Sequence, residues 1–170
     1  MQTYCQSNTE STGSREQQRQ HSRERILSAA IRSFAQAGFD AASIAEIAKQ
    51  AGVKKSLVQY HFATKENLWQ SSVNYLWSQR DLALQQFSSL SPDNDVSLRE
   101  IFRGIASFNR SHPEWVTLLF RESSSPGPRL SWLIETHLND DITRGKEFVV
   151  AFQQAGLLPQ VSALQLLHLI

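Results

Sequence analysis

Apolar residues recur every three or four positions over most of the chain, and no stretch alternates as an amphipathic strand does. The first such segment covers residues 23–37, and Gly38 follows where a left-handed residue would end a helix. Two shorter segments, 44–51 and 54–62, are separated by the permissive Gly52. Three helices with one tight turn between the last two are typical of a helix-turn-helix, which enters the major groove of DNA.

Two local signals predict where helices begin. Ser43 is followed three residues later by Glu46, which predicts a capping box and a helix that begins near Ile44. Thr64 precedes Lys65 at the start of a fourth helix. The exposed amides and the dipole at that helix start favour an anion such as phosphate.

The segment 54–62 carries polar and cationic side chains on the side that Val58 and Phe62 leave free. Such groups contact the phosphates and base edges of DNA. The candidates are Lys54, Lys55, Ser56, Gln59, Tyr60 and His61. The alternative for each residue taken alone is ordinary surface or core, but their position on the second helix of this motif favours DNA contact.

The remainder of the chain is also predicted to be helical, so we expect an all-α fold. The expected helices cover residues 64–90, 97–110, 115–122, 129–155 and the start of another over 161–170. The last segment ends in the apolar run ALQLLHLI, which predicts that the final helix is truncated at Ile170.

Three regions follow from this pattern: a polar tail over 1–21, a helix-turn-helix domain over 22–66 and a helical body over 67–170. The tail is rich in Gln and Ser and is expected to be disordered. Arg15 and Arg19 in the tail, with Arg23 and Arg25 just after it, could form a mobile arm that follows phosphates or enters a minor groove, but a solvated tail is the preferred interpretation.

The charge distribution supports the assignment of the DNA-binding region. The chain has 17 basic and 16 acidic residues, but residues 1–66 hold nine basic and six acidic ones. Residues 67–170 hold eight basic and ten acidic residues. The excess of positive charge therefore belongs to the predicted DNA-binding part.

Other function classes lack their signatures. Cys5 is the single cysteine, the histidines are scattered, and no Gly-rich phosphate loop or nucleophile elbow occurs. No segment approaches the ~18 apolar residues that a membrane span needs, and no signal peptide is evident. We therefore expect a cytoplasmic protein that is not an enzyme and has no metal, cofactor or membrane partner.

Residues 23–68 resemble the DNA-binding domain of the tetracycline-repressor (TetR) family. The resemblance lies in RERILSAAIRSFAQAGFDAASIAEIA, AGV, YHF and TKENL. It implies a helix-turn-helix headpiece followed by a helical body that binds a small effector and pairs two subunits. Lys54 stands where the family often has a small hydroxyl residue, and Leu57 stands where Thr is common.

The resemblance also implies roles for individual residues. Contacts to the DNA backbone are expected from Ser43, Tyr60, His61 and Lys65, and base reading from Lys55, Ser56, Leu57 and Gln59. Lys54 could meet a phosphate. Leu57 could touch a thymine methyl, and Gln59 could pair with the N6 and N7 edge of adenine.

The body is rich in aromatic residues. If it holds an effector pocket, the expected lining is Phe102, Phe108, Trp115, Phe120 and Trp132, suited to a small apolar or aromatic effector. The alternative is that these rings are ordinary core. A homodimer is expected because one headpiece reads only a few base pairs and a second copy supplies the other half-site.

The sequence therefore predicts a homodimeric transcriptional regulator that binds double-stranded DNA, represses at palindromic operators and is released by a small-molecule effector. One alternative is a constitutive DNA-binding or architectural protein without an effector. Another is a helical protein-interaction module with a vestigial headpiece.

Overall fold

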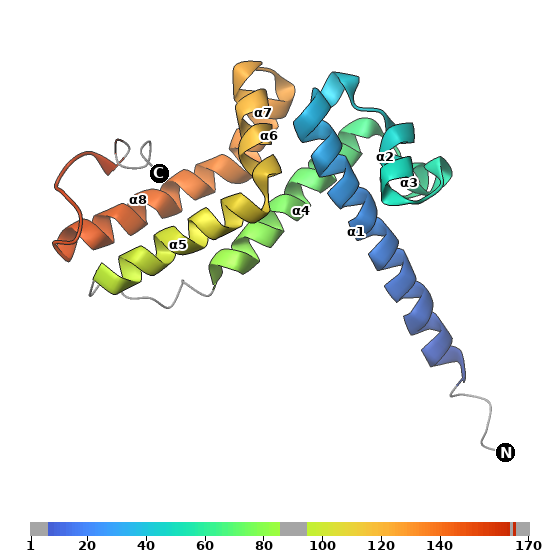
Figure 1. The fold of residues 1–170 in the computed structure, drawn as a ribbon, viewed down its shortest axis with the longest axis horizontal. Helices are drawn as coiled ribbons and strands as arrows, with labels where there is room; N and C mark the ends of the chain where they lie inside the picture. The colour runs from blue at the N-terminus through green and yellow to red at the C-terminus, as the bar shows by residue number, and fades with distance from the viewer. Residues whose placement is uncertain (1–6, 86–94, 164, 166–170) are drawn as a thin grey trace. The chain divides into compact units, whose positions relative to one another are not determined.

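The computed structural model describes residues 7–85, 95–163 and 165, and every regular element in these ranges is helical (Figure 1). The predicted all-α fold is confirmed. The elements are α1 (Ser7–Ala41), α2 (Ile44–Ala51), α3 (Lys55–Phe62), α4 (Lys65–Gln85), α5 (Asp95–Ser111), α6 (Pro113–Ser124), α7 (Pro128–Leu133), the π-helical turn η1 (Ile134–Leu138) and α8 (Asn139–Gln154).

The chain divides into two compact units, Met1–Leu76 and Trp77–Ile170. We call the first the headpiece and the second the body. The division lies inside α4, whereas the sequence pattern placed it before residue 67. Leu68, Trp69 and Val73 of α4 are buried, so the first turns of this helix belong to the headpiece core.

The first helix is longer than predicted. It begins at Ser7, whereas the sequence pattern predicted a helix from residue 23. These residues include good helix formers, and they extend a helix that is already nucleated by packing farther along. Side-chain pairs one turn apart add support: Gln20 donates to Glu24 over 2.7 Å, and Arg19 lies 3.5 Å from Glu16.

Gly38 interrupts α1 as predicted. Its backbone leaves helical geometry, with φ 81° and ψ 168°, a conformation that glycine adopts readily. The following turn closes with the amide of Ala42 donating to the carbonyl of Gly38 over 3.1 Å. The chain is thereby turned into α2.

The start of α2 only partly follows the prediction. The helix begins at Ile44, but the hydroxyl of Ser43 makes no capping hydrogen bond. Glu46 instead reaches forward along the helix, accepting from Gln50 over 3.4 Å and lying 3.8 Å from Lys49. The predicted capping box is therefore wrong, because Glu46 has partners within its own helix.

The turn between α2 and α3 and the start of α4 follow the sequence. Gly52 has φ 64° and ψ 37°, the left-handed conformation expected of a glycine that ends a helix. Its amide donates to the carbonyl of Lys49, and that of Val53 donates to Ala48, each over 3.0 Å. Thr64 caps α4, since its hydroxyl accepts from the amide of Asn67 over 3.1 Å.

The headpiece core is built from small and aliphatic side chains of α1 to α4. The predicted apolar stripe of α1 is buried, and helices α1, α2 and α3 pack against one another. The main buried contributors are Ile26, Leu27, Ala30, Ile31, Phe34, Ile47, Ala48, Ala51, Val58 and Phe62. Val58 and Phe62 fix which side of α3 faces inward.

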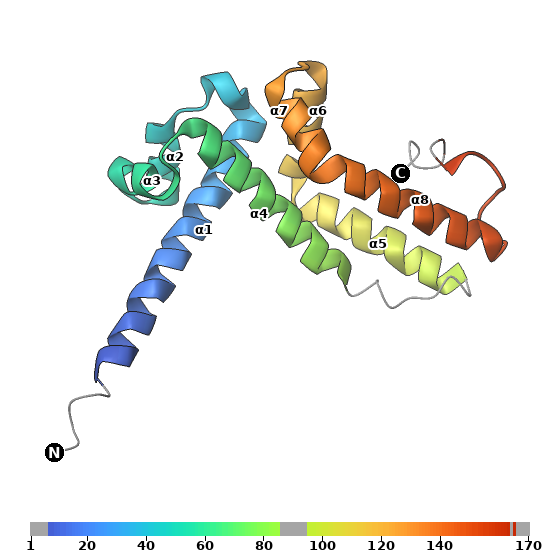
Figure 2. The same ribbon diagram turned by 180° about the vertical axis from the view of Figure 1, so that it is seen from behind.

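The body contains the end of α4 and α5 to α8. The predicted long helix over 129–155 is present as α7, η1 and α8 in succession, and Gly156 follows with φ 74°. Figures 1 and 2 draw α5 and α8 alongside each other. The predicted break at 91–94 and most of the final helix over 161–170, including its end at Ile170, lie outside the described residues.

No helix in the described part of the chain is both long enough and apolar enough to cross a membrane.

Candidate nucleic-acid interface

Helix α3 presents a polar outer face. Its inward side chains, Val58 and Phe62, are almost completely buried, whereas Tyr60 is 73% exposed. Lys54, Lys55, Ser56 and Gln59 are also exposed, and Leu57 is half-buried. The structure therefore gathers the predicted base-reading residues on the accessible side of one short helix.

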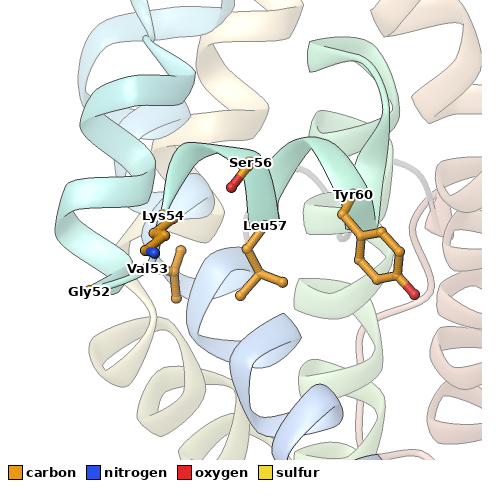
Figure 3. Close-up of a pocket in the computed structure, with 6 residues that line it drawn as sticks. All are labelled: Gly52, Val53, Lys54, Ser56, Leu57 and Tyr60. Carbon is orange, nitrogen blue, oxygen red and sulfur yellow. The ribbon is translucent and has the colours of Figure 1, made fainter.

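A shallow hollow of about 510 Å³ lies beside the first turns of α3 (Figure 3). Val53 and Leu57 supply apolar groups, while Lys54 and the hydroxyl of Tyr60 stand toward its two ends. An apolar surface next to a cation and a hydroxyl suits the thymine methyl and the phosphates of a DNA groove.

Two further residues predicted to contact phosphates, Ser43 and Lys65, differ in exposure and in hydrogen bonding. Ser43 is exposed at the start of α2, and its hydroxyl is not used in capping. Lys65 is half-buried: its Nζ donates to the carbonyl of Asp40 over 3.0 Å and lies 4.8 Å from the ring centroid of Phe39. Lys65 thus ties α4 to the α1–α2 connection, and its ammonium keeps further hydrogens to donate.

His61 is half-buried near the end of α3, and its contact with the DNA backbone stays a prediction. Its Nε2 is buried without a hydrogen-bond partner in the described part of the chain, and its ring lies 5.4 Å from that of Tyr60 and 5.8 Å from that of Phe62. Burial lowers the pKa of His61, and the charges of Arg19 and Arg23 lower it further. His61 is therefore neutral near pH 7 and offers no positive charge to a phosphate.

The predicted effector residues do not form one set. Phe108, Trp115 and Trp132 join an aromatic cluster with Trp77 and His137. The ring centroids of Trp77 and Trp115 are 4.0 Å apart, and those of Trp77 and His137 are 4.6 Å apart. This cluster is close-packed, as expected of core side chains.

Phe102 and Phe120 do not belong to that aromatic cluster. Phe102 is half-buried, and Phe120 is 74% exposed on α6. Phe120 is thus a surface residue of α6 here, and its place in an effector pocket stays a prediction. Leu118 and Glu122 form the buried side of α6, and Phe120 is two positions from each, so it points to the opposite side of the helix.

A network of charged side chains, missed by the sequence reasoning, lies within the aromatic cluster. Asp141 accepts hydrogen bonds from Arg80, from Trp77 Nε1 over 3.0 Å and from Arg144 over 2.7 Å. The Arg80 guanidinium also lies 4.9 Å from the ring of Trp115. Arg80 and Asp141 are 61 residues apart in sequence, and no local pattern predicts their pairing.

The network determines the charge states in the body. Burial would raise the pKa of Asp141, but hydrogen bonds from Arg80 and Arg144 outweigh it and the pKa is lowered. Burial would lower the pKa of Arg80, but hydrogen bonds to Asp141 and Asp81 outweigh it and the pKa is raised. Burial lowers the pKa of His137. The cluster thus holds an ion pair beside a neutral imidazole.

Comparison with known proteins agrees with the headpiece geometry. The sequence model described as bacterial regulatory proteins, tetR family, matches residues 26–71. These residues run from the apolar stripe of α1 through α2 and α3 into α4. Residues 26–71 therefore match the tetR family.

Relatives within and near this family extend the match beyond the headpiece. The transcriptional repressor NicS of Pseudomonas putida is 31% identical over 119 residues, which cover 70% of this chain and 56% of NicS. The transcriptional regulator RutR of Escherichia coli K12 is 25% identical over 161 residues, which cover 94% of this chain and 74% of RutR. The chain thus spans about half the length of NicS.

A solved structure resembles the fold as well. The crystal structure of HlyIIR, a hemolysin II transcriptional regulator, aligns with a TM-score of 0.68 and 28% identity. The alignment covers 89% of this chain and 83% of HlyIIR. The likeness in fold therefore extends beyond residues 26–71.

Proposed function

We propose that this protein is a DNA-binding transcriptional regulator of the tetR family that binds a palindromic operator as a homodimer and represses the genes beside it. The observation that carries the proposal is the polar outer face of α3, held outward by the buried Val58 and Phe62. The proposal includes a cytoplasmic location, where operator DNA is found, and no catalytic role.

Sequence discrimination is assigned to the middle of α3. Gln59 is exposed and carries an amide that can form two hydrogen bonds with an adenine edge. Lys55 and Ser56 are exposed one turn earlier and can donate to bases or phosphates. Leu57, in the hollow beside them, can accept a thymine methyl.

Dimerisation supplies the second half-site that one headpiece lacks. Helix α8 keeps two large apolar side chains on its surface: Ile142 is 42% exposed and Val150 is 43% exposed. They are eight residues apart and so lie on a similar side of the helix. Their burial against a second copy supports a homodimer through the last helices.

Release by a small apolar effector is the regulatory part of the proposal. An effector must bind one arrangement of the dimer more tightly than the other, by a few kcal/mol, to shift the population away from DNA. Phe108, Trp115 and Trp132 already lie in one aromatic cluster of the body, which supports binding there.

A second candidate is a constitutive DNA-binding protein without an effector. It is favoured by the close packing of the same cluster, where ring centroids lie 4.0–5.8 Å apart around the Arg80–Asp141 ion pair. A core filled in this way offers a ligand no volume unless side chains rearrange.

Fluorescence anisotropy tests the DNA-binding part. We expect the protein to bind the DNA upstream of its own gene at least ~10³-fold more tightly than a scrambled duplex at physiological salt. Gln59→Ala should reduce this discrimination by about 10-fold or more, because alanine cannot form the two hydrogen bonds to a base edge. The matched control is Gln154→Ala, which removes an exposed glutamine from the end of α8.

Equal binding to both duplexes would contradict a specific regulator, and no binding even at low salt would favour an interaction module with a vestigial headpiece. For the effector, a panel of small aromatic compounds is screened for those that raise the melting temperature. If none of the binders weakens operator affinity at saturation, the constitutive alternative replaces effector release.

A further inference from the structure

We propose that the first part of α1 is a component of the DNA interface, in which Arg19, Arg23 and Arg25 bind backbone phosphates beside the two ends of α3. This inference rests on the proposed DNA-binding function. It assigns to an ordered helix the three arginines that the sequence pattern left in or next to a solvated tail.

Arg19 and Arg23 lie beside the C-terminal end of α3. The guanidinium carbon of Arg23 is 5.5 Å from the ring centroid of Phe62, the last residue of α3. His61 directly precedes Phe62, and the positive charges of Arg19 and Arg23 contribute to lowering its pKa, after burial. The two residues are four apart on one helix and therefore present their charges on the same side of α1.

Arg25 lies at the other end of α3. Its Nη2 occupies the space where a Cβ at Gly52 would stand, so the guanidinium rests directly on the α2–α3 turn. Gly52 is also a wall of the hollow beside α3, together with Lys54 (Figure 3). The absence of a side chain at Gly52 thus allows the Arg25 guanidinium to come close to the predicted base-reading surface.

The three guanidinium groups are available to a phosphate. No carboxylate in the described part of the chain pairs with Arg23 or Arg25. Among the described residues Arg19 pairs with one carboxylate, that of Glu16 at 3.5 Å, and both side chains are at least 60% exposed. Such an exposed pair contributes little free energy, so a phosphate can replace Glu16 at little cost.

The dimensions of α3 fit this arrangement. Eight residues of α-helix are about 12 Å long, and the major groove of DNA is about 12 Å wide. A helix of this length within the groove has phosphates within reach of long side chains at both ends. Arginine is suited to that position because its planar guanidinium binds phosphate through two parallel hydrogen bonds.

The test uses the full chain and measures how DNA affinity depends on salt. Arg19, Arg23 and Arg25 are replaced together by Gln in one variant and by Lys in another. We expect the Gln variant to lower the slope of log K against log [salt] by about 3 for each bound subunit, and so by about 6 for the proposed dimer, because each phosphate that is no longer neutralised lowers it by about 1. It should weaken binding to the upstream DNA and to a scrambled duplex by the same factor. The Lys variant should keep the slope.

The matched control is a variant with Arg103 and Arg110 of α5 replaced by Gln, which removes exposed arginines from the body. Its salt slope should equal that of the wild type. Circular dichroism melting shows whether each variant folds. If the triple Gln variant does not fold, the single Arg19→Gln variant replaces it, with an expected slope change of about 1 per subunit and about 2 for the dimer.

The outcomes separate this inference from the proposed function. If the wild type binds no DNA, the proposed function fails and this inference fails with it. If the wild type binds and the Gln variant keeps the wild-type slope, only the role of α1 is overturned. Reduced discrimination with an unchanged slope would also overturn it, because the arginines would then read bases instead of phosphates.

Discussion

The headpiece and the body use their polar side chains in opposite ways. In the headpiece the core is apolar and rich in alanine, and the polar groups of α3 lie on the surface. In the body, Arg80 and Asp141 are nearly buried and are bound to each other among aromatic rings. A unit whose polar groups are already paired inside is held together by them, whereas exposed polar groups remain available to a partner.

The largest effect should come from breaking the internal network of the body. Asp141→Asn removes the more buried of the two carboxylates that pair with Arg80 and leaves its guanidinium, 12% exposed, with only the largely exposed Asp81, so the free energy of unfolding should fall by about 3 kcal/mol. Urea denaturation followed by tryptophan fluorescence measures this, because Trp77 donates to Asp141.

The control for that measurement is Asp140→Asn, one residue earlier on α8 and exposed. Its free energy of unfolding should stay within about 0.5 kcal/mol of the wild type. If both variants are destabilised equally, the Arg80–Asp141 pair does not stabilise the body, and the contrast with the headpiece disappears.

A smaller effect on stability should distinguish the start of α4, which is capped by a side chain, from the start of α2, which is not. Thr64→Ala removes a hydroxyl that caps α4, so we expect a decrease of ~1 kcal/mol in the free energy of unfolding. Ser43→Ala removes a hydroxyl that makes no capping bond, and its stability should change by only a few tenths of a kcal/mol. Thermal and urea denaturation of both variants check this.

Ser43→Ala should instead weaken binding to DNA if its free hydroxyl meets a phosphate, as the family resemblance implies. A decrease of ~1 kcal/mol in the stability of Ser43→Ala would restore the capping box predicted from the sequence. The hydroxyl of Ser43 would then be occupied in capping α2, and its proposed contact with a phosphate would lose its support.

The smallest effect concerns pH, and each unit contains one histidine that should produce it. The pKa of His61 and that of His137 are lowered, mainly by burial, from the ordinary value of 6.5. The unfolded state therefore binds more protons than the folded state just below pH 6.5, so stability falls as the pH is lowered through this range. Asp141, with a pKa below 3.8, loses its contribution only at more acidic pH.

Urea denaturation between pH 5 and pH 7.5 measures this dependence. His137→Phe keeps a ring in the aromatic cluster and should flatten the pH dependence, and His61→Phe should flatten it in the headpiece. The exposed His21 serves as control through His21→Gln, which should leave the dependence unchanged. A wild-type stability that is constant over this range would contradict both assignments.

The sequence predicted what depends on neighbours along the chain. Gly38 and Gly52 mark the ends of helical segments, Thr64 caps α4, and the apolar period identifies Val58 and Phe62 as the buried side of α3. These features arise within one or two helical turns, and so the fold and the outer face of α3 could be predicted.

Features that depend on distant residues could not be predicted. Arg80 meets Asp141 only after α4 and α8 have packed within the body, and the burial of His61 depends on α1. Ser43 and Glu46 show that even a local motif can yield to competing partners, here Gln50 and Lys49. The roles of individual side chains toward DNA likewise depend on a partner molecule and stay predictions.

The π-helical turn η1 sets the rotational phase of α8. A hydrogen bond that spans five residues instead of four accommodates one extra residue per turn, which rotates all that follows by about 100° relative to an uninterrupted α-helix. His137 lies within this turn, and Asp141 is the third residue after its end. Deleting a single residue here would leave α8 helical yet turn Asp141 away from Arg80. The Arg80–Asp141 ion pair thus depends on the number of residues in η1 as well as on their identity.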